Sequence, residues 1–99
     1  MFQQMRDLLK LQAQAKRMQK EMRQISVEAE SEGGKIRVEM NGEQIVQKIE
    51  IAEDLLRPEN KHRLETGLLK TLREAAKAIQ RQVAQKGKAM MGGLSGLLK

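Results

Sequence analysis

Residues 25–51 decide the fold, and they read ISVEAESEGGKIRVEMNGEQIVQKIEI. Apolar and charged residues alternate with a period of two on both sides of Gly33-Gly34, as in strands with one polar face. Gly33-Gly34 and Asn41-Gly42 are turn signals that join antiparallel strands into hairpins. The positions expected to face a core are Val27, Ala29, Ser31, Ile36, Val38, Met40, Ile45, Ile49 and Ile51. The stretch therefore predicts a three-stranded antiparallel meander.

The register of the first hairpin follows from its turn. A two-residue turn at Gly33-Gly34 places Glu30 opposite Arg37, and it places Glu32 opposite Lys35, so the polar face gains pairs of opposite charge. In the third strand Val46 and Gln47 break the alternation. That break predicts either a bulge or a second contact surface.

The segment before the strands, residues 1–24, has helical periodicity and no Gly or Pro. Its apolar residues recur at alternating spacings of three and four, the a/d pattern of a helix that packs along one seam. The seam consists of Leu8, Leu11, Ala15, Met18, Met22 and Ile25. All six basic residues of the segment fall on the other side of the helix.

A second helix is predicted after a connector at residues 52–60. Pro58 and Glu59 suit its first turn, and the helical pattern continues to about Met91. The apolar side carries Leu64, Leu68, Leu72, Ala75, Ile79 and Val83, and a basic stripe opposite carries Lys70, Arg73, Lys77, Arg81 and Lys88. Gly67 indicates a close backbone approach, and Lys86 projects on the apolar side.

These elements predict an α+β fold of the order α-β-β-β-α, with a meander flanked by two long helices. Residues 1–91 form one domain, and the glycine-rich residues 92–99 form a flexible tail. The chain has 99 residues and one aromatic, Phe2, so its core is aliphatic and small. Long helices of this composition gain burial from a second copy, which favours a homodimer.

Charge is segregated along the chain. Residues 1–24 carry a net charge of +4, residues 25–58 a net charge of −4, and residues 59–99 a net charge of +6. Few acids on the helices balance their bases, while acids are abundant on the sheet. This distribution favours a polyanionic partner for the helices.

The sequence offers no active site. His62 is the only histidine and has no nucleophile or acid partner in the pattern. Glu28, Glu30 and Glu32 alternate on one strand, which is typical of a solvated face that opposes sheet aggregation rather than of metal ligands. There is no P-loop, dinucleotide fingerprint or metalloprotease motif. We therefore expect no enzyme, cofactor, metal or small-molecule substrate.

Compartment is indicated only indirectly. The absence of cysteine suits a reducing cytoplasm. The N-terminus lacks the apolar region of a signal peptide, and no apolar run approaches the ~20 residues of a membrane span, so no membrane is expected.

The shortage of aromatics distinguishes between nucleic acids. Proteins that bind single strands or RNA usually stack bases on aromatic rings, and this chain has only Phe2. Duplex DNA held through its phosphates fits better, because this contact needs only exposed cations. The candidate DNA-binding residues are Lys16, Arg17, Lys20 and Arg23 on the first helix and Lys77, Arg81, Lys86 and Lys88 on the second.

Several segments together resemble the YbaB/EbfC family of bacterial nucleoid-associated DNA-binding proteins, over nearly the whole chain. The resemblance rests on LQAQA at 11–15, MQKEM at 18–22, VEMNG at 38–42, IEI at 49–51, LL at 55–56, REAA at 73–76 and MGGL at 91–94. It implies a tweezers-shaped homodimer with protruding helices that binds DNA at the nucleoid. The family's usual Asp-Pro after the third strand is replaced here by Ala52-Glu53-Asp54.

The leading hypothesis is a non-enzymatic, homodimeric duplex-DNA binder in the cytoplasm, at the nucleoid, that organises the chromosome or modulates transcription. The alternative is a structural or adaptor protein whose helices bind an acidic protein partner. Competition with duplex DNA separates the two.

Overall fold

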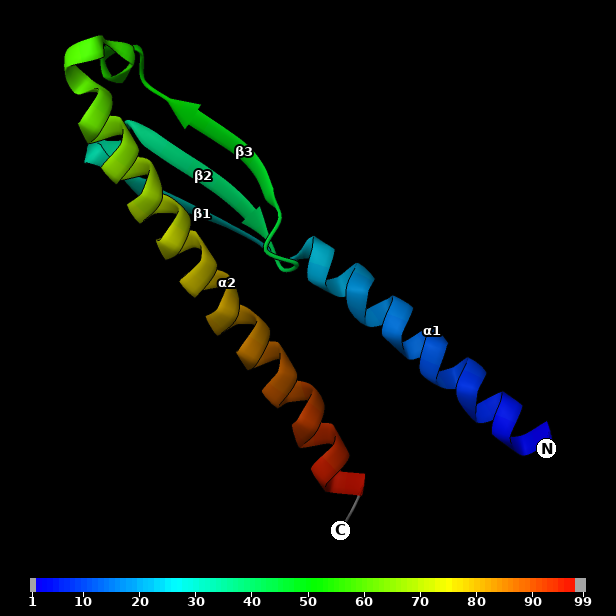
Figure 1. Ribbon diagram of the computed structural model, residues 1–99. Coiled ribbons are helices and arrows are strands. Elements are labelled where there is room, and N and C mark those ends of the chain that lie inside the picture. Colours follow the sequence, from blue (N-terminus) through cyan, green and yellow to red (C-terminus); the bar gives the residue numbers. More distant parts are fainter. Residues whose placement is uncertain (1, 98–99) are drawn as a thin grey trace.

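The computed structural model describes residues 2–97, with side chains up to residue 88, and it has the order α-β-β-β-α. Helix α1 spans Phe2–Gln24 and helix α2 spans Lys61–Leu97, while strands β1, β2 and β3 span Ser26–Ser31, Ile36–Asn41 and Val46–Ile51. The strands form one antiparallel sheet in the order β1-β2-β3. Figure 1 shows α2 running along one face of the sheet and both helices projecting beyond the same end of it. The predicted fold class is confirmed.

Helix α2 continues to Leu97, past the end of its periodic pattern at Met91. The flexibility expected for residues 92–99 stays a prediction, and residues 98–99 lie outside the described residues. Within residues 2–97, neither helix combines the length and the apolar character that a bilayer crossing requires.

The first hairpin has the predicted register. Glu30 is paired with Arg37 across β1 and β2, and their side chains form an ion pair of 3.5 Å. Gly33 and Gly34 have φ angles of +66° and +87°, a region that glycine adopts without steric cost. The backbone amide of Lys35 donates to the carbonyl oxygen of Glu32 at 3.3 Å and closes the turn.

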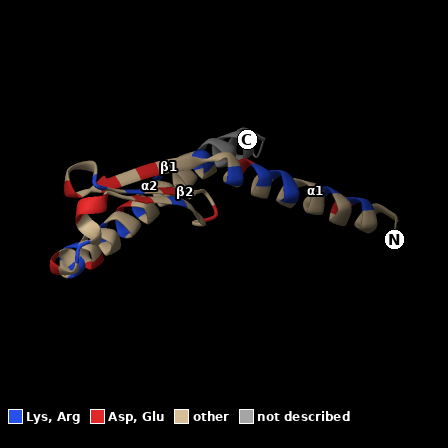
Figure 2. Ribbon diagram, turned by 90° about the horizontal axis from the view of Figure 1, so that it is seen from above, with Lys and Arg blue, Asp and Glu red and all other residues tan. Residues whose placement is uncertain are grey.

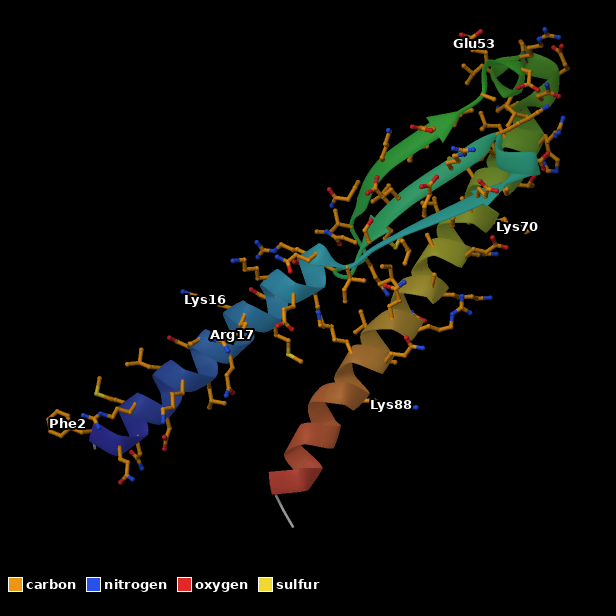
Figure 3. All side chains as sticks on the ribbon, turned by 180° about the vertical axis from the view of Figure 1, so that it is seen from behind. Phe2, Lys16, Arg17, Glu53, Lys70 and Lys88 are labelled. Atoms are coloured by element: carbon orange, nitrogen blue, oxygen red, sulfur yellow. The ribbon has the colours of Figure 1, made fainter. Side chains whose placement is uncertain are left out.

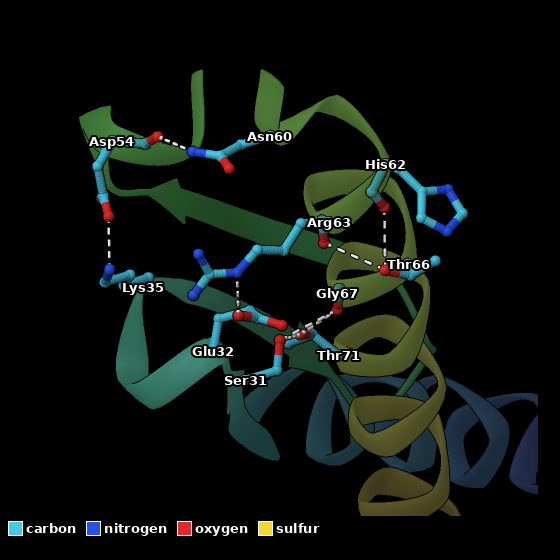
Figure 4. A network of polar contacts seen from close by, with 10 residues as sticks. All are labelled: Ser31, Glu32, Lys35, Asp54, Asn60, His62, Arg63, Thr66, Gly67 and Thr71. Atoms are coloured by element: carbon cyan, nitrogen blue, oxygen red, sulfur yellow. Dashed lines mark hydrogen bonds and ion pairs between the residues drawn. The ribbon is translucent and has the colours of Figure 1, made fainter. Parts of the chain in front are cut away.

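The side chains of Glu32 and Lys35 do not pair with one another, contrary to the prediction. The Glu32 carboxylate accepts from Arg63 Nε at 2.6 Å, and Lys35 donates to Asp54 (Figure 4). The reason is tertiary: the turn lies beside the connector and the first turns of α2, and both provide partners that a hairpin alone lacks.

The second hairpin is longer than a two-residue turn. Asn41 N donates to the Ile45 carbonyl at 3.0 Å, so Gly42, Glu43 and Gln44 form the loop, and Gln44 takes a φ of +62°. The Asn41 side-chain oxygen accepts from the amides of Glu43 and Ile45. Beyond the loop, β3 pairs through Val46 with Met40 and through Lys48 with Glu39. Gln47, which lies between these two pairs, has no partner on β2, and this extra residue confirms the predicted bulge.

The core lies between α2 and the first two strands. Val27, Val38 and Met40 from the sheet pack with Ala75 and Ile79 from α2. Leu55 and Ile36 are also fully buried. Sequence periodicity did not identify Leu55, because it lies in the connector, within a short 3-10 helix at Glu53–Leu56.

Gly67 marks the close approach that the sequence predicted. A Cβ atom at Gly67 would lie 2.6 Å from Ile36 Cδ1, so a larger residue at this position would push α2 away from β2. The Gly67 carbonyl accepts from Ser31 Oγ at 3.1 Å and from Thr71 Oγ1 at 2.7 Å (Figure 4). Pro58 opens a single 3-10 turn, Pro58–Asn60, and α2 itself begins only at Lys61.

Two apolar surfaces are left uncovered by the described chain. Helix α1 contains no buried residue, and Leu8 and Leu11 of its seam are 59% and 62% exposed. The bulge turns Val46, which pairs with Met40, to the core-facing side of the sheet, where the sequence predicted Ile45. Val46 and Ile49 on this side are 38% and 46% exposed, since α2 packs on β1 and β2. A single copy of this chain therefore leaves its longest apolar seam in solvent.

Candidate nucleic-acid interface

Basic side chains follow both helices. All eight sequence-predicted DNA-binding residues are exposed, and they are Lys16, Arg17, Lys20, Arg23, Lys77, Arg81, Lys86 and Lys88. Figure 2 shows Lys and Arg along α1 and α2, while acidic residues lie on β1. The charge segregation along the sequence is thus also a segregation in space.

The two stripes do not face each other within one chain. Lys16 projects from the side of α1 that points away from α2, and Lys88 projects from the side of α2 that points away from α1 (Figure 3). The facing sides of the helices are apolar near the sheet, where Met18, Met22 and Val83 line a small cavity of about 80 Å³. A duplex between the helices of one chain would meet this apolar lining rather than the two stripes.

Among the described side chains, two of the eight cations form ion pairs and the other six do not. Arg23 Nε lies 2.7 Å from Glu43 Oε1, and Lys86 Nζ lies 3.7 Å from Glu21 Oε2. The position of Lys86 on the apolar side of α2 was visible in the sequence. Its partner on α1 was not, because the crossing of the two helices sets that contact.

The end of α1 is held by Gly42. The Gly42 amide donates to the carbonyl oxygens of Met22 at 2.9 Å and of Ile25 at 3.0 Å. Met22 lies in the last turn of α1, and its carbonyl oxygen also accepts from the Ile25 amide at 3.2 Å, so the Gly42 amide adds a bond from the β2–β3 loop to the end of the helix. A Cβ atom at Gly42 would lie 2.3 Å from the Met22 oxygen, so only glycine permits this contact. The sequence predicted Gly42 as a turn residue and missed its role in positioning α1.

The outer face of the sheet is acidic. Glu28 is directly opposite Glu39, and Arg37, Lys48 and Glu50 lie on the same face. The hydrogen bond between Lys48 and Glu50 raises the pKa of the Lys48 ammonium and lowers the pKa of the Glu50 carboxyl. Such a face repels phosphate, so the sheet is the less favourable side for DNA.

His62 is exposed at the start of α2, and among the described side chains no group of three or more His, Asp or Glu residues is placed to hold a metal ion. Phe2 is 84% exposed at the outer end of α1 and belongs to no aromatic surface. The arrangement can bind a polyanion by charge, and it lacks an aromatic stacking platform for bases.

The chain is similar to several known proteins. Residues 1–94 match the model of the YbaB/EbfC DNA-binding family. A nucleoid-associated protein from Pelotomaculum thermopropionicum is 34% identical over 95 residues, which are 96% of this chain and 87% of that protein. A nucleoid-associated protein from Chloroflexus aurantiacus is 32% identical over 87 residues, which are 88% of this chain and 87% of that protein.

The fold also has a solved counterpart. The crystal structure of an uncharacterized protein from Helicobacter pylori matches with a TM-score of 0.68 at 20% identity, over 84% of this chain and 96% of that one. At this identity the match establishes a shared fold.

Proposed function

The chain belongs to the YbaB/EbfC DNA-binding family, and from that premise we propose that it is a nucleoid-associated protein that binds duplex DNA without catalysing a reaction. It acts in the cytoplasm, at the nucleoid, in chromosome organisation or in the modulation of transcription. The observation that carries the proposal is the placement of exposed cations along both helices, apart from the acidic residues of β1.

The contact is mainly with phosphate. Lysine and arginine side chains along a helix neutralise backbone phosphates and release condensed counterions, which needs no reading of bases. Helix α1 has 23 residues, which at 1.5 Å per residue is about 35 Å. This length is close to one turn of B-form DNA. One helix can therefore reach several phosphates along one side of a duplex.

The active form is a homodimer. The uncovered seam of α1 and the uncovered side of β3 support this state, because soluble chains seldom leave contiguous apolar surfaces in water. A second copy also provides a way for the outward-facing stripes to bind one duplex. It can bring the α1 stripe of one chain and the α2 stripe of the other to a common duplex.

The test of DNA binding is a fluorescence-anisotropy titration of two unrelated duplexes over a range of salt concentrations. We expect binding to both duplexes, and a steep linear fall of log K with log salt concentration. Absence of binding at low salt would overturn the proposal. An adaptor for an acidic protein would instead retain that partner when excess unlabelled duplex is added.

A further inference from the structure

The elbow between α1 and the rest of the chain holds two ion pairs that use candidate DNA-binding residues. Arg23 pairs with Glu43 of the β2–β3 loop, and Lys86 of α2 pairs with Glu21 of α1. Among the described side chains, no ion pair forms at the other six candidates, which are Lys16, Arg17, Lys20, Lys77, Arg81 and Lys88.

Within one copy of the chain, packing fixes the direction of α1 only weakly. None of its residues is buried, and the space between its last turns and α2 contains the cavity lined by Met18, Met22 and Val83. The polar contacts that constrain it within one copy are the backbone bonds of Gly42 and the two ion pairs. Gly42 holds the end of α1 at one point, about which the helix can turn. The ion pairs bind it on two further sides, to the loop and to α2, and thus set its angle.

Both pairs remain accessible to solvent. The side chains of Arg23 and Glu43 are 63% and 30% exposed, and those of Lys86 and Glu21 are 43% and 39% exposed. Ion pairs with this exposure are weak and are screened by salt. A DNA phosphate accepts from arginine and lysine in the same way as a carboxylate, and a duplex presents many phosphates at high local density. It is therefore an effective competitor for both cations.

We propose that Glu21 and Glu43 are positioning residues that hold α1 at its angle to α2 in the absence of DNA, and that phosphates of a bound duplex take Lys86 and Arg23 from them and release the helix. The proposal rests on the proposed function. The angle between α1 and α2 in the DNA-free protein is then incompatible with bound DNA. Breaking the two ion pairs lowers the net free energy of DNA binding. Gly42 stays bonded to Met22 and acts as the pivot.

The test measures the distance between α1 and α2 in solution. The chain has no cysteine, so Gln12→Cys and Gln82→Cys provide the only sites for spin labels, one on each helix. Electron–electron double resonance gives the distribution of distances, and excess unlabelled protein removes contributions between copies. We expect a narrow distribution for the labelled protein alone and a shifted or broader one after duplex is added.

The decisive variant is Glu21→Gln/Glu43→Gln, which keeps side-chain size and removes both pairs. We expect its distribution without DNA to be already broad, and its affinity for duplex to rise about two- to thirtyfold, the range expected from two exposed ion pairs. The matched control is Glu53→Gln/Glu59→Gln, which removes the same charge at the opposite end of the sheet. It should leave the distance unchanged. The reversed pair Arg23→Glu/Glu43→Arg should keep the narrow distribution.

Two results would overturn the proposal. One is an unchanged distribution in Glu21→Gln/Glu43→Gln, which would mean that the acids do not position α1. The other is an unchanged distribution when the parent protein binds duplex, which would mean that phosphate does not displace them. A parent protein that fails to bind duplex at any salt concentration refutes the proposed function instead, and the comparison of the DNA-free proteins still tests the positioning role.

Discussion

The amide of Gly42 donates to the carbonyl oxygen of Met22 at 2.9 Å, and this bond joins the end of α1 to the loop between β2 and β3. The two residues are far apart in the sequence, yet the approach is so close that Gly42 is fully buried against the Met22 backbone. The contact explains how the end of a helix without any buried side chain is held at the β2–β3 loop. It also makes Gly42 the position where the smallest change has the largest structural effect.

We predict that Gly42→Ala destabilises the chain and frees α1. The added methyl group would lie 2.3 Å from a backbone oxygen, which cannot move without displacing the helix. We expect a loss of about 1–3 kcal/mol, the usual cost of leaving a buried polar group without its partner. Urea unfolding followed by circular dichroism measures it.

Gly87→Ala is the control for that change. A Cβ atom at Gly87 would have no neighbour within 4 Å, and alanine is favoured over glycine inside a helix by about 1 kcal/mol. We expect Gly87→Ala to stabilise the chain. Equal effects of the two substitutions would contradict the role assigned to Gly42.

A second prediction concerns Gly67 and Ile36. Gly67→Ala places a methyl group 2.6 Å from Ile36 Cδ1 in the core. Ile36→Val removes that carbon atom and opens room for it, at a cost of about 0.5–1.5 kcal/mol on its own. We expect the double variant to be more stable than the sum of the two single effects, because the clash disappears. Additive free energies of unfolding in this cycle would show that α2 and β2 are not in such close contact.

The pH dependence of stability includes a contribution from Asp54. The hydrogen bond from Lys35 holds the pKa of the Asp54 carboxyl below its ordinary value of 3.8. A carboxyl with a lower pKa in the folded state stabilises the fold above its unfolded pKa, and this stabilisation is lost as the pH falls through the folded pKa. We predict that Asp54→Asn is less stable than the parent at pH 7, and that the difference is smaller at pH 2, where protonation of the carboxyl is favoured.

Unfolding free energies at both pH values check this prediction. Glu53→Gln neutralises the neighbouring carboxyl, which forms no ion pair among the described side chains, and we expect it to match the parent at both. A difference between Asp54→Asn and the parent that is the same at pH 7 and pH 2 would exclude a contribution from the ionised carboxylate.

How far the sequence determines the fold differs between elements. The strands, the register of Glu30 with Arg37, the bulge and the close approach at Gly67 follow from local patterns, and the structure confirms them. The partners of Glu32 and Lys35, the burial of Leu55 and the elbow at Gly42 depend on how distant segments meet. Periodicity in a single sequence carries no information on contacts between distant segments.

The features of the candidate site also differ in how far the sequence predicts them. That the cations lie opposite the apolar sides of their helices was predictable, because helical geometry alone sets it. The pairing of Arg23 and Lys86 with carboxylates was not predictable, since both partners come from other elements. The stripes could be located from the sequence, whereas their orientation away from each other could not.

Removing charge from the acidic face of the sheet should change duplex affinity in the opposite direction from removing charge from the basic stripes. Glu28→Gln/Glu30→Gln removes two negative charges from this face without touching the core. We expect duplex affinity to stay unchanged or to rise, because repulsion of phosphate falls. Anisotropy titrations at two salt concentrations measure it. A clear loss of affinity in the folded variant would place DNA on the sheet instead of on the helices.

Because the apolar seam of α1 is uncovered in one copy, we predict that the homodimer forms through this seam. We expect light scattering to give twice the mass of one chain at micromolar concentration, and Leu8→Glu/Leu11→Glu to lower it to the mass of one chain, since charges do not enter an apolar seam. Gln12→Glu/Gln19→Glu adds the same charge to α1 outside the seam and should leave the mass unchanged. A parent protein with the mass of one chain would refute the dimer.

The last prediction tests the two basic stripes directly. Lys16→Ala/Arg17→Ala/Lys20→Ala shortens the stripe on α1, and Lys77→Ala/Arg81→Ala shortens the stripe on α2. These side chains are exposed and form no ion pair among the described residues, so both variants should stay folded. Each lost phosphate contact reduces the slope of log K against log salt concentration by about 0.9. We therefore expect weaker binding and a flatter slope in both variants.

The comparison of two unrelated duplexes completes this test. Contacts with phosphate alone weaken binding to both duplexes by the same factor, whereas contacts with bases weaken one more than the other. Circular dichroism confirms that each variant is folded before its affinity is interpreted. If both folded variants keep the affinity and salt slope of the parent, the stripes are only the solvated sides of their helices. Loss of binding to a single duplex would instead mean that the helices read sequence.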